Sequence, residues 1–313
     1  MHARNGIPVL VSALAVMLSA TPSHAQGQDA PAPAAPAMTF RSGVNLVSVA
    51  AVVRDKRGRV MPSLKGQDFE VLDGGQRKEL IDFQSTTTAP ASIALLIDGS
   101  GSMRLGSAQD SAQHISRDIV RTLDPSRDTA ALYSFDTRLL TLCDFTGDFE
   151  AIRAGLWDVD AFGSTSLYDA VAGTSAIVAE RAQARRAVIV LTDGADTTSQ
   201  YTSEQVASIA SAIDVPVYVF AVGDGLAPSL HDQKHDAEGG SLAALARATG
   251  GDLFIANTPE SIAASVKKVT DELRHQYVLA FEAAPDGGRR RLEVRMRRPE
   301  LRVKSRSWYR GLE

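Results

Sequence analysis

Oxygen-bearing side chains recur at three separate places in the chain, and their types suit a hard metal ion. They lie in Asp98-Gly99-Ser100-Gly101-Ser102, in Gly163-Ser164-Thr165 and in Leu191-Thr192-Asp193-Gly194. Mg2+ takes small oxygen ligands in octahedral geometry and keeps several waters. Asp98 and Asp193 would balance its charge, while the hydroxyls of Ser100, Ser102 and Thr165 add ligands without charge. The set predicts a site for Mg2+, or for Mn2+ or Ca2+, with one position open for an outside acidic group.

These five residues resemble the metal-ion-dependent adhesion site of the von Willebrand factor type A domain. In that family Asp-x-Ser-x-Ser is followed by a distant Thr and then by an Asp before Gly, and this chain matches each position. The resemblance implies that Ser100, Ser102 and Thr165 bind the ion through their hydroxyls. It also implies that Asp98 and Asp193 act directly or through water. Three such motifs in order are more specific than a single turn of Ser and Gly.

Strands and helices are expected to alternate through the middle of the chain. Apolar runs at 93–97, 130–135, 187–191, 215–222 and 253–256 are separated by helical patterns near 107–123, 167–182, 203–213, 241–249 and 259–275. This alternation predicts an α/β domain with a doubly wound, mostly parallel sheet, covered on both faces. Ligands bind such sheets beyond the carboxyl ends of the strands. Asp98 and Asp193 fall at two of these ends.

Further strands are expected on both sides of this domain. The patterns lie at 44–54, 69–72 and 78–83 before it and at 276–281, 289–296 and 301–307 after it. Asp73-Gly74-Gly75 between two of them indicates a hairpin. Either group is too small to bury a two-sheet core alone, so we expect one shared β-sandwich with the α/β domain inserted in it. The arrangement resembles a bacterial secreted subgroup of the family over about residues 44 to 309.

The amino-terminal residues are typical of an exported protein. Residues 1–25 resemble a signal peptide, with Arg4, an apolar run over 7–20 and cleavage after Ala25. The run is too short to span a membrane. The predicted organisation is a signal peptide at 1–25, a Pro/Ala-rich linker at 26–43, a β-rich segment at 44–88, the A domain at 89–275 and a second β-rich segment at 276–313. We expect a periplasmic or secreted protein without a transmembrane segment after processing.

Composition and charge fit a folded protein of 313 residues, 44% hydrophobic and 22% charged. Cys143 is the only cysteine, so no intrachain disulfide can form. We expect it to be a small buried residue. Residues 289–310 carry ten basic residues against two acidic ones. Such a segment can bind polyanions. The alternation of Leu292 and Val294 with charged residues favours instead a strand with one wet face.

Other constellations point less clearly to chemistry. His231 and His235 stand four residues apart, but nearby Gly and Pro favour a solvated loop. Ser100 lacks the Gly-x-Ser-x-Gly pattern of a hydrolase elbow. No phosphate-binding or dinucleotide-binding Gly pattern occurs. Asp169 and Asp196 are interpreted as turn and helix-start residues. We therefore expect neither an enzyme nor a nucleic-acid-binding protein.

The favoured function is metal-dependent protein binding, an adhesion or scaffold role in which the ion accepts an Asp or Glu carboxylate from a partner. One alternative is a structural module without a metal-dependent ligand. Another is attachment to a polyanion or surface through the basic carboxyl-terminal strands.

Overall fold

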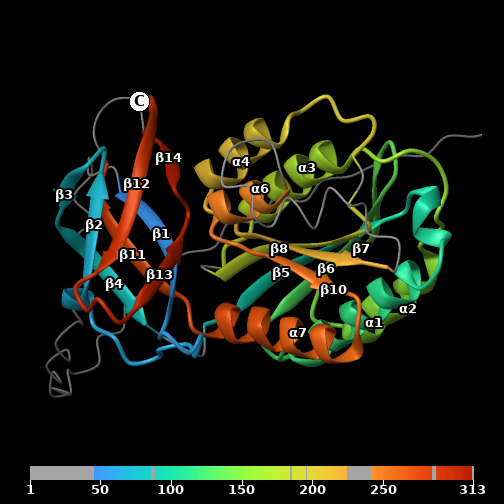
Figure 1. Cartoon of the computed structure of the whole chain (residues 1–313), viewed down its shortest axis with the longest axis horizontal. Helices are drawn as coiled ribbons and strands as arrows, with labels where there is room; N and C mark the ends of the chain where they lie inside the picture. The colour runs from blue at the N-terminus through green and yellow to red at the C-terminus, as the bar shows by residue number, and fades with distance from the viewer. Residues whose placement is uncertain are drawn as a thin grey trace, which may run out of the picture. The chain divides into compact units, whose positions relative to one another are not determined.

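The central part of the molecule is a six-stranded sheet with helices on both faces (Figure 1). This computed structural model describes residues 46–85, 89–183, 185–194, 196–223, 242–283 and 287–311. The predicted signal peptide and linker lie outside them. The strands of this sheet are β5 (Ala91–Asp98), β6 (Thr129–Phe135), β7 (Leu139–Thr146), β8 (Arg185–Thr192), β9 (Val217–Val222) and β10 (Leu253–Ala256). The helices are α1 (Ala108–Arg121), α2 (Phe149–Gly155), α3 (Leu167–Ala179), α4 (Ser203–Ala212), α6 (Leu242–Thr249) and α7 (Pro259–Arg274).

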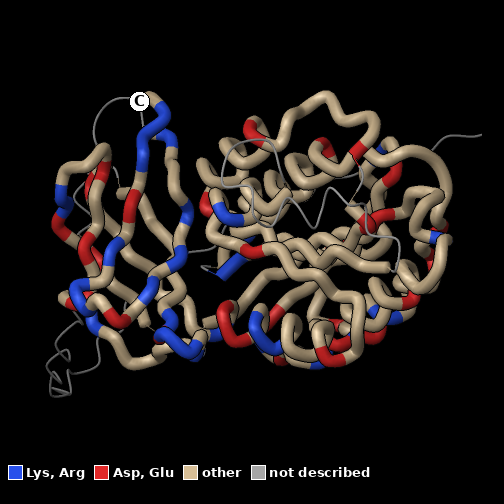
Figure 2. The backbone as a smooth tube through the Cα atoms, viewed as in Figure 1, with Lys and Arg blue, Asp and Glu red and all other residues tan. Residues whose placement is uncertain are grey.

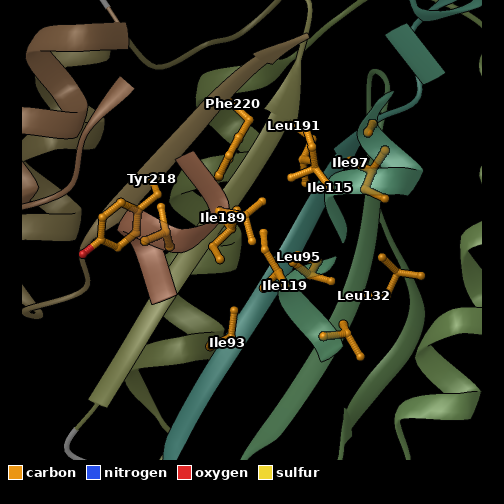
Figure 3. Packing of buried hydrophobic residues seen from close by; sticks show 14 of the residues in the cluster. Ile93, Leu95, Ile97, Ile115, Ile119, Leu132, Ile189, Leu191, Tyr218 and Phe220 are labelled. Atoms are coloured by element: carbon orange, nitrogen blue, oxygen red, sulfur yellow. The ribbon is translucent and has the colours of Figure 1, made fainter. Parts of the chain in front are cut away.

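Strand β5 shows why the sequence forms a sheet that is covered on both sides. Ile93, Leu95 and Ile97 point into one core, which Ile115 and Ile119 of α1 complete (Figure 3). The alternate residues Ala94 and Leu96 belong to a second core, under α3, α4 and α6. Both faces of the strand are therefore buried, which explains its almost uniformly apolar sequence. The predicted α/β class is confirmed.

The sheet order creates a switch point at its centre. The order is β10-β9-β8-β5-β6-β7, with β5 paired in parallel to both β8 and β6. The chain leaves β5 toward β6 on one side and later returns to β8 on the other. The carboxyl ends of β5 and β8 thus flank the place where α/β sheets bind ligands. The exception to the parallel pattern is β7, which pairs antiparallel to β6 at the edge.

Strands from both sides of the central sheet form two antiparallel sheets. Their members are β1 (Leu46–Arg54), β2 (Phe69–Asp73), β3 (Gln76–Lys78), β4 (Leu80–Ser85), β11 (Tyr277–Glu282), β12 (Arg289–Met296), β13 (Arg302–Ser305) and β14 (Trp308–Arg310). The orders are β13-β1-β11-β4 and β14-β12-β2-β3. A single apolar cluster, which includes Val49, Val71, Leu279 and Leu292, draws residues from both sheets. Early and late segments therefore complete one core.

One strand expected from sequence is divided between the two sheets, and another is followed by a strand of the other sheet that was not expected. The pattern at 78–83 separates at Glu79 into β3 and β4, whereas the pattern at 301–307 forms β13 alone, and β14 follows beyond Arg306. Each crossing turns a corner of the sandwich, yet the residues on both sides of it keep a β-type sequence.

The short helix α2 was not expected. It begins after Asp148, whose carboxylate accepts hydrogen bonds from Glu150 N and Ala151 N.

Arg306 occupies one of these corners and is 4% exposed. Its guanidinium donates to the backbone oxygens of Ser211 (2.5 Å) and Ala212 (3.2 Å) at the end of α4, and to that of Ser48 in β1. It also pairs with Asp214 at 3.2 Å. The Asp214 carboxylate in turn accepts the Ala50 amide at 3.1 Å. This residue joins the sandwich to the α/β domain through polar contacts that are largely removed from water.

Basic residues of the carboxyl-terminal strands follow the predicted one-sided pattern. Leu292 and Val294 are buried, whereas Arg295 is exposed. At least five of the ten basic residues form ion pairs: Arg290 with Asp73, Arg295 with Glu293, Arg298 with Asp68, Lys304 with Glu272 and Arg306 with Asp214. Figure 2 shows acidic residues interspersed with the basic ones on these strands. The local positive charge is therefore balanced in large part within the fold.

Cys143 departs from its expected burial. It lies on the edge strand β7, is a free thiol of intermediate exposure, and only borders the core. An edge strand has a neighbour on one side only, which leaves part of the side chain accessible.

Among the described residues, none of the helices is long and apolar enough to cross a membrane.

Candidate functional site

Asp98 ends β5 and is buried at the switch point, with 1% of its surface exposed. Its Oδ1 accepts the Ser100 amide at 2.8 Å, and its Oδ2 accepts the Thr192 hydroxyl at 2.5 Å. Thr192 is the last residue of β8. The two neighbouring strand ends are thus joined through side chains, and the carboxylate is fixed in one orientation.

The environment of Asp98 is unfavourable to its negative charge. Burial raises the pKa of this carboxyl to about 6, although the hydrogen bonds from Thr192 and Ser100 act in the opposite direction. The nearby Asp193 raises the pKa further. Asp98 and Asp193 form no ion pair with a described residue. A buried carboxylate without a counter-charge is a costly feature unless a cation compensates it.

Ser100 and Ser102 lie in the first loop and in the short 3-10 helix η2 (Gly101–Arg104) that follows it. Ser100 is 1% exposed, and its hydroxyl is 3.0 Å from that of Ser102. The predicted hydroxyl pair is therefore brought together beside Asp98. Hydroxyl oxygens at this spacing can share one partner.

The second loop places Thr165 through backbone contacts. The Gly101 amide donates to the Gly163 oxygen at 3.1 Å, which joins the first two loops. Gly163 has φ of 100°, a conformation that favours glycine. The Thr165 amide donates to the Thr197 hydroxyl at 3.0 Å, and its carbonyl accepts the Thr197 and Thr198 amides. Its own hydroxyl has no hydrogen bond to a described residue, although Thr165 is 3% exposed.

Asp193 directly follows β8 in the third loop. Its Oδ1 is buried and has no hydrogen-bond partner among the described residues. Gly194 follows with φ of 97°, and its amide donates to the Thr192 hydroxyl oxygen at 3.0 Å. The turn thus holds Asp193 at the strand end beside Asp98. A buried carboxylate oxygen without a partner among the described residues is a position that a bound cation would satisfy.

Three further residues position the loops. Thr192 was not singled out from the sequence, although it belongs to the Leu191–Gly194 motif and its hydroxyl contacts both Asp98 and Gly194. Asp196 accepts the Leu167 amide at 2.8 Å at the start of α3. Asp169 accepts the amides that follow in the third loop, those of Gln200 and Tyr201. The interpretation of both acids as structural residues agrees with these contacts.

The rival metal site expected from His231 and His235 lies outside the described residues. Within the described ranges no group of three or more His, Cys, Asp or Glu could hold a metal ion. A site built on those residue types is therefore not found there. The set at the switch point has two carboxylates and three hydroxyls, and such oxygen ligands suit Mg2+, Mn2+ or Ca2+.

One family model matches the segment that contains these loops. The family model of the von Willebrand factor type A domain matches residues 93–195. A comparison with curated proteins gave no match.

Among solved structures, the chain is similar to BatB from Bacteroides thetaiotaomicron, with 16% identity, 58% of this chain and 98% of that one covered, and a TM-score of 0.45. It is also similar to the vWF domain of the type V pili tip protein Mfa5 from Porphyromonas gingivalis, with 24% identity, 37% and 41% coverage, and a TM-score of 0.32. A third similar structure is the proximal thread matrix protein 1 from the mussel byssus, with 17% identity, 64% and 49% coverage, and a TM-score of 0.46. The matched segment includes all three loops, so residues 93–195 of this chain are similar to the von Willebrand factor type A domain.

Proposed function

We propose that the chain binds a divalent cation, with Mg2+ as the first candidate, and that the bound ion accepts an Asp or Glu carboxylate from a partner protein. Asp98, Ser100, Ser102, Thr165 and Asp193 would hold the ion. The observation that carries the proposal is the pair of carboxylates at the ends of β5 and β8. One is buried with a raised pKa, and the other has a buried oxygen without a hydrogen-bond partner among the described residues.

The coarser part of this function follows from the family. Von Willebrand factor type A domains mediate protein–protein interaction, so the chain carries a protein-interaction module. The proposal adds a mechanism to it. Two carboxylates neutralise a divalent ion, and three hydroxyls leave its charge unchanged. Because Mg2+ seldom receives a full set of ligands from protein alone, a carboxylate from outside can replace a bound water.

Substitution of one hydroxyl tests the metal half of the proposal. Thr165→Val keeps the shape and charge of the side chain but removes one oxygen. We expect this variant to bind Mg2+ at least about tenfold more weakly than the unchanged protein, as measured by titration calorimetry.

The matched control is Thr174→Val in α3. Thr174 is fully buried, and its hydroxyl has no partner among the described residues. The control makes the same chemical change away from the strand ends and should leave Mg2+ affinity unaltered. Equal Mg2+ binding by Thr165→Val and the unchanged protein would mean that the site has been assigned to the wrong residues.

The attachment of a polyanion through the basic strands is a weaker candidate. Lys304 and Arg306 are directed at Glu272 and Asp214 inside the fold, so neither charge is available to an outside ligand. Exposed pairs such as Arg295 with Glu293 also reduce the net field. A purely structural role for the metal loops remains the other alternative, and it predicts metal binding without capture of carboxylates.

We also propose that the protein acts outside the cytoplasm. This proposal is supported by the sequence pattern of residues 1–25. Mass spectrometry of the protein from its native source should find a mature chain that begins at Gln26. A chain that retains Met1 and the apolar run would contradict it.

A further inference from the structure

Two large apolar side chains are exposed to solvent on the loops of the proposed ion site. Leu105 is 73% exposed and Phe162 is 74% exposed, the highest values among the large hydrophobic residues that the structure describes. Leu105 follows Ser102 by three residues, and Phe162 precedes Thr165 by three. Each therefore lies on a loop that supplies a proposed ligand.

Hydrogen bonds join these two loops along their length. The Phe162 amide donates to the Gly99 oxygen at 2.6 Å, and the Gly101 amide donates to the Gly163 oxygen. Beyond them, the Arg104 guanidinium pairs with Asp160 at 3.0 Å. Leu105 follows Arg104, and the Phe162 amide itself makes one of these bonds, so both residues lie on the segments that join the loops.

Neither side chain contributes to the packing of the fold. Neither belongs to any of the three apolar cores or to the residues packed against them. Trp157, the next most exposed at 70%, has the Arg117 guanidinium over its ring at 5.6 Å. Phe162 has no comparable ring contact with a described residue. Apolar area left in water next to a binding site favours a partner that covers it.

We propose that the partner presents its Asp or Glu between apolar side chains, so that the carboxylate reaches the ion while its neighbours cover Leu105 and Phe162. This inference rests on the proposed function. Asp98 and Asp193 repel an acidic group until a cation neutralises them, so the apolar contacts act together with the ion. The two parts divide the recognition: the ion selects the carboxylate, and the apolar pair selects the residues on either side of it.

Three short peptides on a sensor surface test the inference. They are acetyl-Gly-Leu-Glu-Phe-Gly-amide, the same peptide with Gln for Glu, and acetyl-Gly-Gly-Glu-Gly-Gly-amide. At saturating Mg2+ the full-length protein should bind the first at least about tenfold more tightly than either of the others. EDTA should abolish this binding.

Variants separate the two parts of the site. The double change Leu105→Ser with Phe162→Ser should remove the advantage of the first peptide over the Gly-flanked one. Its Mg2+ affinity, measured by calorimetry, should stay the same. Ile81→Ser is the matched control, because Ile81 is 52% exposed but lies on β4 of the sandwich. This control should behave like the unchanged protein.

The other outcomes are distinct. Equal, Mg2+-dependent binding of both Glu peptides would overturn the apolar contact and leave the proposed function standing. Failure of every Glu peptide to bind in Mg2+ would remove the proposed function and this inference with it. Equal binding of the Glu and Gln peptides, insensitive to EDTA, would mean apolar adhesion alone and would also overturn the inference.

Discussion

Replacing Arg306 with Met should lower the melting temperature by roughly 6–20 °C, because breaking a buried ion pair costs about 3–5 kcal/mol and each kcal/mol shifts a domain of this size by about 2–4 °C. Arg306 is 4% exposed and contacts Asp214, Ser211 and Ser48 at the same time. The Met side chain fills similar space but leaves Asp214 without its counter-charge and several carbonyl oxygens without donors. Differential scanning calorimetry measures the shift.

Arg295→Met provides the matched control for this prediction. Arg295 lies on β12 and pairs with Glu293, with side-chain exposures of 53% and 40%. Exposed pairs contribute about 0–1 kcal/mol, so the melting temperature should move by only about 4 °C or less. If both variants melt at the same temperature, the corner contacts of Arg306 do not hold the sandwich to the α/β domain.

Asp98→Asn should produce two opposite effects, a more stable metal-free protein and the loss of stabilisation by Mg2+. The pKa of Asp98 is about 6 in the folded protein against 3.8 for an ordinary Asp. The ionised carboxylate therefore destabilises the fold at pH 7 by roughly 3 kcal/mol, from about 1.4 kcal/mol per pKa unit. Asn can still accept the Ser100 amide and donate to Thr192 while carrying no charge.

The sign of this effect can be followed with pH. The raised pKa means that the cost is absent below about pH 4 and complete above about pH 6. In EDTA, the melting temperature of Asp98→Asn should exceed that of the unchanged protein at pH 7, and the difference should shrink as the pH falls to 4. In Mg2+, the order should reverse, because only the unchanged protein gains binding energy. An Asn variant that is less stable in EDTA at pH 7 would contradict this account.

The α/β fold could be predicted because the apolar pattern of each strand shows whether one or both of its faces are buried. Ile93 to Ile97 is uniformly apolar since both faces of β5 are buried. The strands on either side of the α/β domain could be predicted from their alternating apolar and polar residues. Their pairing could be predicted because each group alone has too few strands to bury a two-sheet core. The division of 78–83 between the sheets and the extra strand β14 after 301–307 could not be predicted, because a chain keeps its β-type residues while it turns the corner of a sandwich.

The candidate site was predictable in its ligands but not in its supports. Oxygen side chains at strand ends point to Asp98 and Asp193 from the sequence alone. Thr192 could not be predicted as a support, since a Thr at the end of a strand is common and only the structure shows its bond to Asp98. Arg306 was one of ten basic residues in a charged segment. Nothing in that segment distinguishes the one that is buried against α4 from those in water.

The most direct test of the ion site is a crystal structure of the protein grown with Mn2+, with diffraction recorded at a wavelength where manganese scatters anomalously. Mn2+ prefers the same oxygen ligands as Mg2+ and can be located without ambiguity. The account predicts one strong anomalous peak between the ends of β5 and β8, within roughly 2.0–2.4 Å of the hydroxyl oxygens of Ser100, Ser102 or Thr165. An anomalous map with no peak between these strand ends, at a Mn2+ concentration that saturates binding in solution, would contradict it.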